Sequence, residues 1–174
     1  MAVESLISLV TFISTILLLE NDQNALITTT CKNTPNYPLC VSTLQSDPRS
    51  SAAGADVETL CHVMVSAVRS RADEVTRVTI PELRIAQPRW GGPLSQCYFF
   101  YDAVLRADMP QAEAALKSGV PKFAAAGMSD AAKEAENCEA ALRDGEITDS
   151  PLRGINQNVV ELSVVANSII KTLL

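Results

Sequence analysis

Apolar residues recur at steps of three and four along most of this sequence, and this periodicity limits the possible folds more than any other feature. The first such run starts at Asp56 and continues to about Ile85, with charged residues largely between the apolar ones. It predicts a long amphipathic helix with Asp56 as its N-cap. The helix should end at "AQPRWGGP", residues 86–93, where two prolines and two glycines gather. Almost no stretch alternates with period two, so strands are poorly supported.

Three more amphipathic helices follow. The second starts near Leu94, and Pro110 is expected to bend or divide it before "KSG" at residues 117–119. The third passes through residues 131–142 and stops at Gly145, which we expect to act as its C-cap. The last begins at Ser150 and Pro151, a cap followed by a proline at the first helical position. Short breakers between four such helices favour an antiparallel up-and-down four-helix bundle over residues 56–174.

A proline-rich segment precedes the bundle. "CKNTPNYPLC", residues 31–40, contains two cysteines and two prolines and cannot form a long helix. "LITTT" and "LCVSTLQS" flank or overlap it on its two sides. We therefore predict a small helical hairpin over residues 26–50. The fold class is all-α, with one domain over residues 26–174, because the chain is too short for two ordinary domains.

The N-terminus carries an uncharged apolar run over residues 6–19. Its length suits a secretory signal peptide and is too short to cross a bilayer. We predict a signal peptide over residues 1–25, although the cleavage site is not defined by the sequence. Its removal takes away Glu4, Glu20 and Asp22, which leaves 17 acidic and 14 basic residues (20 − 3 against 14). A mildly acidic chain without a basic run argues against nucleic acid as a partner. The sequence has no second long apolar stretch, so we expect no membrane anchor in the mature protein.

The sequence contains five cysteines. In an oxidising compartment they can form two bridges and leave one thiol, with several possible pairings. A bridge within residues 31–40 would close the hairpin turn, and one between Cys97 and Cys138 would join the apolar faces of the second and third helices. Cys61 would then remain free on the buried stripe of the first helix, where an inert packed thiol is expected. The residues alone leave this connectivity open.

No catalytic constellation is visible in the sequence. His62 is the sole histidine and has no metal-ligand spacing to the cysteines, so we expect neither a metal nor another cofactor. Asp102, Glu134 and Glu136 fit solvated charges on helix faces. We therefore predict a binding protein and not an enzyme.

One short segment, "GVPKFAAAGM" at residues 119–128, places a cation and a large aromatic among small residues. The simplest interpretation makes Pro121 the first residue of a helix, Lys122 a solvated side chain, and Phe123 a core or staple residue beneath the turn. The residues alone favour this interpretation over a binding site.

Four segments together resemble the plant invertase and pectin methylesterase inhibitor family. They are "TTTCKNTPNYPLCVSTLQSDPRS", "PRWGGPLSQCYFFYDAVLRA", "GVPKFAAAGMSDAAKEAENCEAAL" and "SPLRGINQNVVELSVVANSIIKTLL". The resemblance covers essentially all of residues 26–174. It implies a four-helix bundle behind a helical hairpin, with the bridges Cys31–Cys40 and Cys97–Cys138.

The resemblance also implies a function, because the invertase-inhibiting branch of the family carries a Pro-Lys-Phe motif between the second and third bundle helices. Here the motif is Pro121, Lys122 and Phe123. We therefore expect a secreted inhibitor of acid invertase (β-fructofuranosidase) that occludes the active-site cleft as a monomer in a 1:1 complex. Its expected location is the apoplast or cell wall, with the vacuole as an alternative. The rival functions are inhibition of pectin methylesterase on the same scaffold and, from another class, binding of a small molecule inside the bundle.

Overall fold

The computed structural model describes residues 24–174, all helices and connecting turns, without a strand in that range. The signal peptide predicted for residues 1–25 lies outside the described residues except for its last two positions. Residues 24–31 are helical and form the hairpin with α2 (Tyr37–Gln45). None of the described helices is both long and apolar enough to span a membrane.

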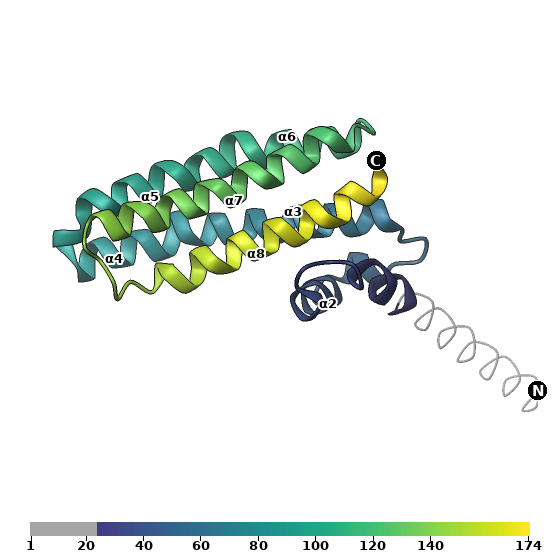
Figure 1. Ribbon diagram of the computed structural model, residues 1–174, viewed down its shortest axis with the longest axis horizontal. Coiled ribbons are helices and arrows are strands. Elements are labelled where there is room, and N and C mark those ends of the chain that lie inside the picture. The colour runs from purple at the N-terminus through teal and green to yellow at the C-terminus, as the bar shows by residue number, and fades with distance from the viewer. Residues whose placement is uncertain (1–23) are drawn as a thin grey trace, which may run out of the picture.

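Four long rods follow the hairpin and run side by side with alternating direction, as Figure 1 shows. The all-α four-helix bundle predicted from the sequence is therefore confirmed. The first rod consists of α3 (Val57–Glu74), the π-helical turn η2 (Val75–Thr79) and α4 (Ile80–Ala86). The second consists of α5 (Gly91–Ala103), the π-helical turn η4 (Val104–Asp108) and α6 (Met109–Lys117). The third rod is α7 (Pro121–Asp144), and the fourth is α8 (Leu152–Ile170).

Both composite rods pass a proline without breaking, and each does so through a π-helical turn. A proline lacks an N–H, and its ring clashes with the carbonyl four residues earlier in a regular helix. In the turns before Pro81 and Pro110, the backbone N–H of Ile80 donates to Val75 and that of Met109 donates to Val104, five residues back. The wider turn makes room for each ring. The expected bend or division at Pro110 is thus a local change of helical pitch within a continuous rod.

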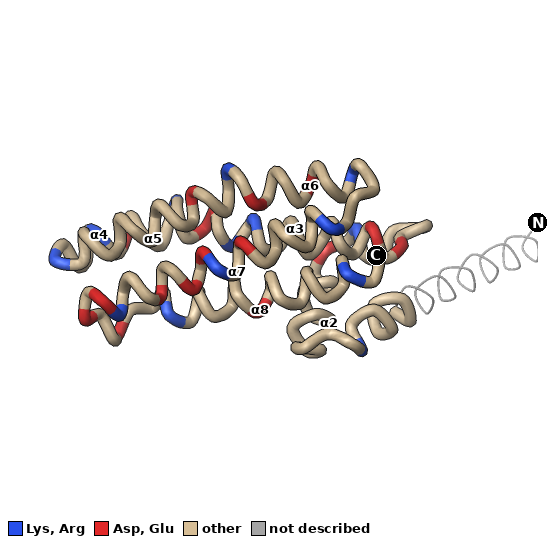
Figure 2. The backbone as a smooth tube through the Cα atoms, turned by 45° about the horizontal axis from the view of Figure 1, so that its top comes forward, with Lys and Arg blue, Asp and Glu red and all other residues tan. Residues whose placement is uncertain are grey.

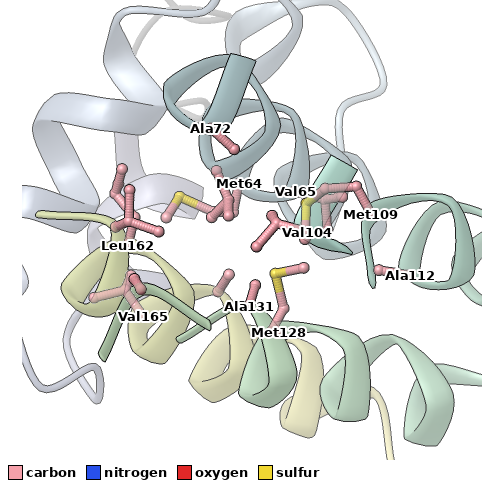
Figure 3. Packing of buried hydrophobic residues seen from close by; sticks show 14 of the residues in the cluster. Met64, Val65, Ala72, Val104, Met109, Ala112, Met128, Ala131, Leu162 and Val165 are labelled. Carbon is pink, nitrogen blue, oxygen red and sulfur yellow. The ribbon is translucent and has the colours of Figure 1, made fainter. Parts of the chain in front are cut away.

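The core lies along the axis of the bundle, where all four rods contribute apolar side chains. Figure 3 shows Met64 of α3, Met109 of α6 and Met128 of α7 directed towards the same interior. Small residues allow α7 to approach its neighbours closely. A Cβ at Gly127 would come within 2.8 Å of the Asp108 carbonyl oxygen, so only glycine fits at this crossing.

Two disulfides fasten the described part of the chain. Cys31–Cys40 closes the hairpin and Cys97–Cys138 joins α5 to α7, with Cα atoms 5.6 and 4.4 Å apart. On the loop-entropy estimate these bridges stabilise the fold by about 2.7 and about 4 kcal/mol. Cys61 is free and fully buried. The structure therefore contains the two-disulfide framework that the resemblance implied.

The predicted Asp56 cap is present, whereas α8 begins one residue later than predicted, with Pro151 and not Ser150 as its N-cap. The Asp56 carboxylate accepts a hydrogen bond from the Thr59 N–H at 2.8 Å, and the Ser150 hydroxyl accepts from the Leu152 N–H at 3.2 Å. Gly145 is the C-cap of α7, but its φ is −82°, and the left-handed conformation belongs to Glu146 (φ 57°). Gly145 is needed for space instead, because a Cβ there would lie 2.5 Å from Cγ of Pro93.

Candidate functional site

The turn between α6 and α7 is a rigid structure, held by backbone hydrogen bonds that close the end of α6. Gly119 adopts the left-handed conformation (φ 66°). Its N–H donates to the Leu116 carbonyl, and the Val120 N–H donates to the Ala115 carbonyl, both at 2.9 Å. This pair of bonds is a Schellman motif. It reverses the chain within Ser118, Gly119 and Val120 and fixes the direction in which α7 leaves.

Pro121 is the first residue of α7, a position where a missing N–H costs nothing and the fixed φ favours the helix. Two further hydrogen bonds hold the backbone beside it. The Phe123 N–H donates to the Val120 carbonyl at 3.1 Å, and the Gln111 side-chain amide donates to the Phe123 carbonyl at 3.3 Å. The segment therefore has little conformational freedom to lose on binding a partner.

Phe123 is exposed, with 56% of its surface accessible. The alternative that places it in the core or beneath the turn is wrong. The helical period explains its position: Ala124, Ala125 and Met128 face the core, so the preceding residue falls on the outer face of α7. Single apolar side chains are common on protein surfaces, and Phe99 is exposed as well, so exposure makes Phe123 accessible to a partner without itself defining a binding site.

Lys122 is also exposed and forms no ion pair among the described residues. In Figure 2 the end of α6 and the turn after it carry a basic residue and no acidic one. The structure therefore brings Pro121, Lys122 and Phe123 together at one end of the bundle, with the cation and the aromatic ring both accessible. The sequence identified these residues only through the motif, because their exposure depends on where α7 begins.

The other candidate reactive residues lack partners for catalysis within the described part of the chain. His62 Nε2 lies 3.9 Å from a Glu58 carboxylate oxygen on the surface of α3. Burial raises the pKa of the Cys61 thiol to about 12, with smaller contributions from the charges of Glu58 and Asp56. A thiol with so high a pKa is a poor nucleophile.

The carboxylates taken as solvated helix-face charges occupy such positions. Asp102 pairs with Arg106 at 2.7 Å, and Glu136 pairs with Lys133 at 3.2 Å. Glu134 accepts a hydrogen bond from the Asn137 amide at 3.3 Å. No group of three potential metal ligands occurs among residues 24–174.

Asp108 is a carboxylate that the sequence did not single out. One of its oxygens is buried without a hydrogen-bond partner. Burial, together with the charges of Asp130 and Glu134 on α7, raises its pKa to about 6. Its position in the π-helical turn before Pro110 puts it against α7, and no feature of the local sequence signals that contact.

The described chain thus combines a closed hairpin, a disulfide-fastened bundle and an exposed lysine and phenylalanine in the first turn of α7, at one end of the bundle. Comparison with known proteins identifies the class. Residues 25–169 match the family described as "Plant invertase/pectin methylesterase inhibitor". The chain belongs to this family, whose members are inhibitors of enzymes and not enzymes.

Individual relatives refine the comparison. An Arabidopsis thaliana protein named "Cell wall / vacuolar inhibitor of fructosidase 1" is 34% identical over 147 residues, which cover 84% of this chain and 68% of that protein. The fold is similar to that of a crystal structure of a mutant form of a pectin methylesterase inhibitor from Arabidopsis, with a TM-score of 0.71, 19% identity and coverage of 85% and 97% of the two chains. A second Arabidopsis pectin methylesterase inhibitor structure gives a TM-score of 0.62 at 19% identity, covering 85% and 95%. At this identity the two structures support the fold alone.

Proposed function

We propose that this protein inhibits plant acid invertase (β-fructofuranosidase) by binding over its active-site cleft and blocking access of sucrose. The observation that carries the proposal is the exposure of Lys122 and Phe123 in the first turn of α7, directly after a hydrogen-bonded turn at the end of the bundle. The name of the 34% identical relative, an inhibitor of fructosidase, supports the same target.

The chemistry of the target fits these two side chains. A glycosidase presents a concave acidic site built around two carboxylates. Lys122 offers a complementary charge on a stem long enough to enter such a site. Phe123 offers an apolar face for surfaces that stack against sugar rings. Pro121 holds the backbone from which both project, which lowers the entropy lost on docking.

The inhibitor acts as a secreted monomer in a 1:1 complex, because one active-site cleft has room for the Pro-Lys-Phe segment of one inhibitor molecule. Its proposed location is the cell wall, with the vacuole as the alternative, in agreement with the name of the relative. Neither a cofactor nor a metal is part of the mechanism, since the interaction depends only on surface complementarity.

The test is the residual activity of an acid invertase titrated with the oxidised protein at acidic pH, with a pectin methylesterase titrated in parallel. Changing Lys122 and Phe123 together to alanine should weaken invertase inhibition by about ten- to a thousandfold, or about 1.4 to 4 kcal/mol. A matched control removes Lys133 and Phe99, an exposed lysine and an exposed phenylalanine on α7 and α5. This control should inhibit invertase like the unchanged protein.

Two results would contradict the proposal in different ways. An inhibition constant unchanged in the Lys122 and Phe123 variant would exclude the anchor. Inhibition of pectin methylesterase alone would assign the protein to the other branch, in which a helical face of the bundle contacts the enzyme. Displacement of an apolar probe by a small molecule, without inhibition of either enzyme, would support the ligand-binding bundle.

A further inference from the structure

The last turn of the chain lies beside the Pro-Lys-Phe motif. A shallow hollow between α7 and the end of α8 is lined by seven residues from both segments: Lys122, Ala125, Ala126, Ser129, Asn167, Lys171 and Leu174. Figure 1 shows the C-terminus at the same end of the bundle as the turn between α6 and α7. The fold thus places Lys171 and Lys122 on the same hollow, although almost fifty residues separate them in the sequence.

The hollow is basic, in contrast to the chain as a whole, whose net charge is −6. Among the side chains that line it in the described chain, two are those of lysines and none is acidic. The sequence contains no Asp or Glu between Glu113 and Asp130, and none after Glu161. Asp56 and Glu58 begin α3 at the same end, but neither lines the hollow, and Asp56 is engaged in capping through Thr59.

A hydrogen bond across the hollow fixes the two helices that carry the lysines. The Asn167 side-chain amide on α8 donates to the Ser129 hydroxyl on α7 at 2.6 Å, and that hydroxyl donates to the Ala125 carbonyl at 3.2 Å. Lys171 lies one turn beyond Asn167, and Lys122 lies two turns before Ser129. The two cations are therefore attached to segments with a defined relative position. The small side chains of Ala125 and Ala126 line the hollow and leave space above it for a partner.

We propose that Lys171 is a second cation of the inhibitory surface, which contacts acidic residues on the rim of the invertase cleft while Lys122 enters the cleft itself. This inference rests on the proposed function and extends it to a residue outside the motif. The partner is identified by charge: two lysines on one surface complement a glycosidase site, whose catalytic groups are two carboxylates.

The experiment measures association and dissociation rates of the oxidised protein with an acid invertase over a series of salt concentrations. A rim charge acts mainly on the association rate, and its effect decreases as salt screens it. Lys171→Glu should slow association about ten- to thirtyfold at low ionic strength and only about two- to threefold at high ionic strength. Lys171→Arg should retain the rate of the unchanged protein.

The matched control is Arg89→Glu, which makes the same change in net charge at the opposite end of the bundle, between α4 and α5. It should slow association about twofold or less. Equal effects of Lys171→Glu and Arg89→Glu would overturn the inference, since only the net charge would then matter. A normal rate for Lys171→Glu, with strong loss in the Lys122 and Phe123 variant, would overturn it and leave the proposed function intact. A protein that does not inhibit invertase would overturn both.

Discussion

Asp108 should make the folded protein more stable in acid than at neutral pH. Its pKa rises from 3.8 to about 6, mainly through burial and further through the charges of Asp130 and Glu134. Between these two values the folded state holds a proton that the unfolded state has released, so the free energy of unfolding decreases as pH rises through this window. The full rise corresponds to about 3 kcal/mol. Because Asp108 is only partly buried, solvent screening reduces the expected effect to about 1 to 2 kcal/mol.

The Asp108→Asn substitution removes this titration while preserving the shape of the side chain. The variant should exceed the original protein by only about 0.5 kcal/mol at pH 4, where the unfolded Asp has begun to ionise, and by about 1 to 2 kcal/mol at pH 7. The measurement is the urea dependence of unfolding at several pH values between these limits, with both disulfides intact. The difference in the free energy of unfolding between the two proteins at each pH is free of the contributions that the other carboxylates make to both. Those of Asp47 and Asp56, whose pKa values are lowered by hydrogen bonds from Arg49 and Thr59, lose their stabilising contribution only at still lower pH.

Two controls separate titration of Asp108 from a general effect of charge. Glu82→Gln removes an exposed carboxylate on α4 and should change the free energy of unfolding little across the same range. Asp130→Asn should reduce the pH dependence without abolishing it, since burial is the larger cause of the raised pKa. A difference between Asp108→Asn and the original protein that stays constant from pH 4 to pH 7 would refute the reasoning.

Three further substitutions test the packing and the turns. Gly127→Ala should lower the free energy of unfolding by about 1 to 3 kcal/mol, because the new methyl would lie 2.8 Å from a backbone oxygen. The measurement is urea unfolding, and a smaller loss of free energy would show that α6 and α7 separate easily. Glu146→Gly should raise the free energy of unfolding by about 0.5 to 1 kcal/mol, because glycine adopts the left-handed conformation at φ 57° without strain. An unchanged melting temperature would contradict this. Replacing Cys97 and Cys138 by serine should cost about 4 kcal/mol in urea unfolding while the hairpin bridge persists, and a loss below about 1 kcal/mol would refute the loop-entropy estimate.

The fold was predictable because its signals are local and repeated. Helical periodicity and the Asp56 cap each depend on a few neighbouring residues, and the structure agrees with both. At the last helix the Ser150 hydroxyl does accept from the Leu152 N–H, but the helix begins at Leu152 with Pro151 as its N-cap, one residue later than predicted. The π-helical turns were not predicted, because the sequence shows a proline but not how the preceding backbone adapts to it. The role of Gly145 was missed for a similar reason: the contact that requires glycine comes from Pro93, some fifty residues earlier.

The candidate site was predictable only in part. Its three motif residues are visible in the sequence, but the exposure of Phe123 follows from the exact residue at which α7 begins, since a shift of one position rotates a helical side chain by about 100°. The neighbourhood of Lys122 and Lys171 could not be found from spacing, because it results from packing of α7 against α8. The raised pKa of Asp108 likewise depends on two carboxylates of another helix.

Under the proposed function, stability and the choice of target enzyme depend on different residues of this molecule. The core and the disulfides contain none of the three motif residues, and the accessible part of Phe123 contributes little to burial of apolar surface. Substitutions at the end of the bundle can therefore change binding without unfolding the protein. A core of this type also tolerates extensive exchange of apolar residues, which explains how structures only 19% identical share the fold. Under the proposed function, a change of target requires new residues only on the exposed surface, and we expect mutations at the end of the bundle formed by α6, α7 and the end of α8 to alter the enzyme that is inhibited.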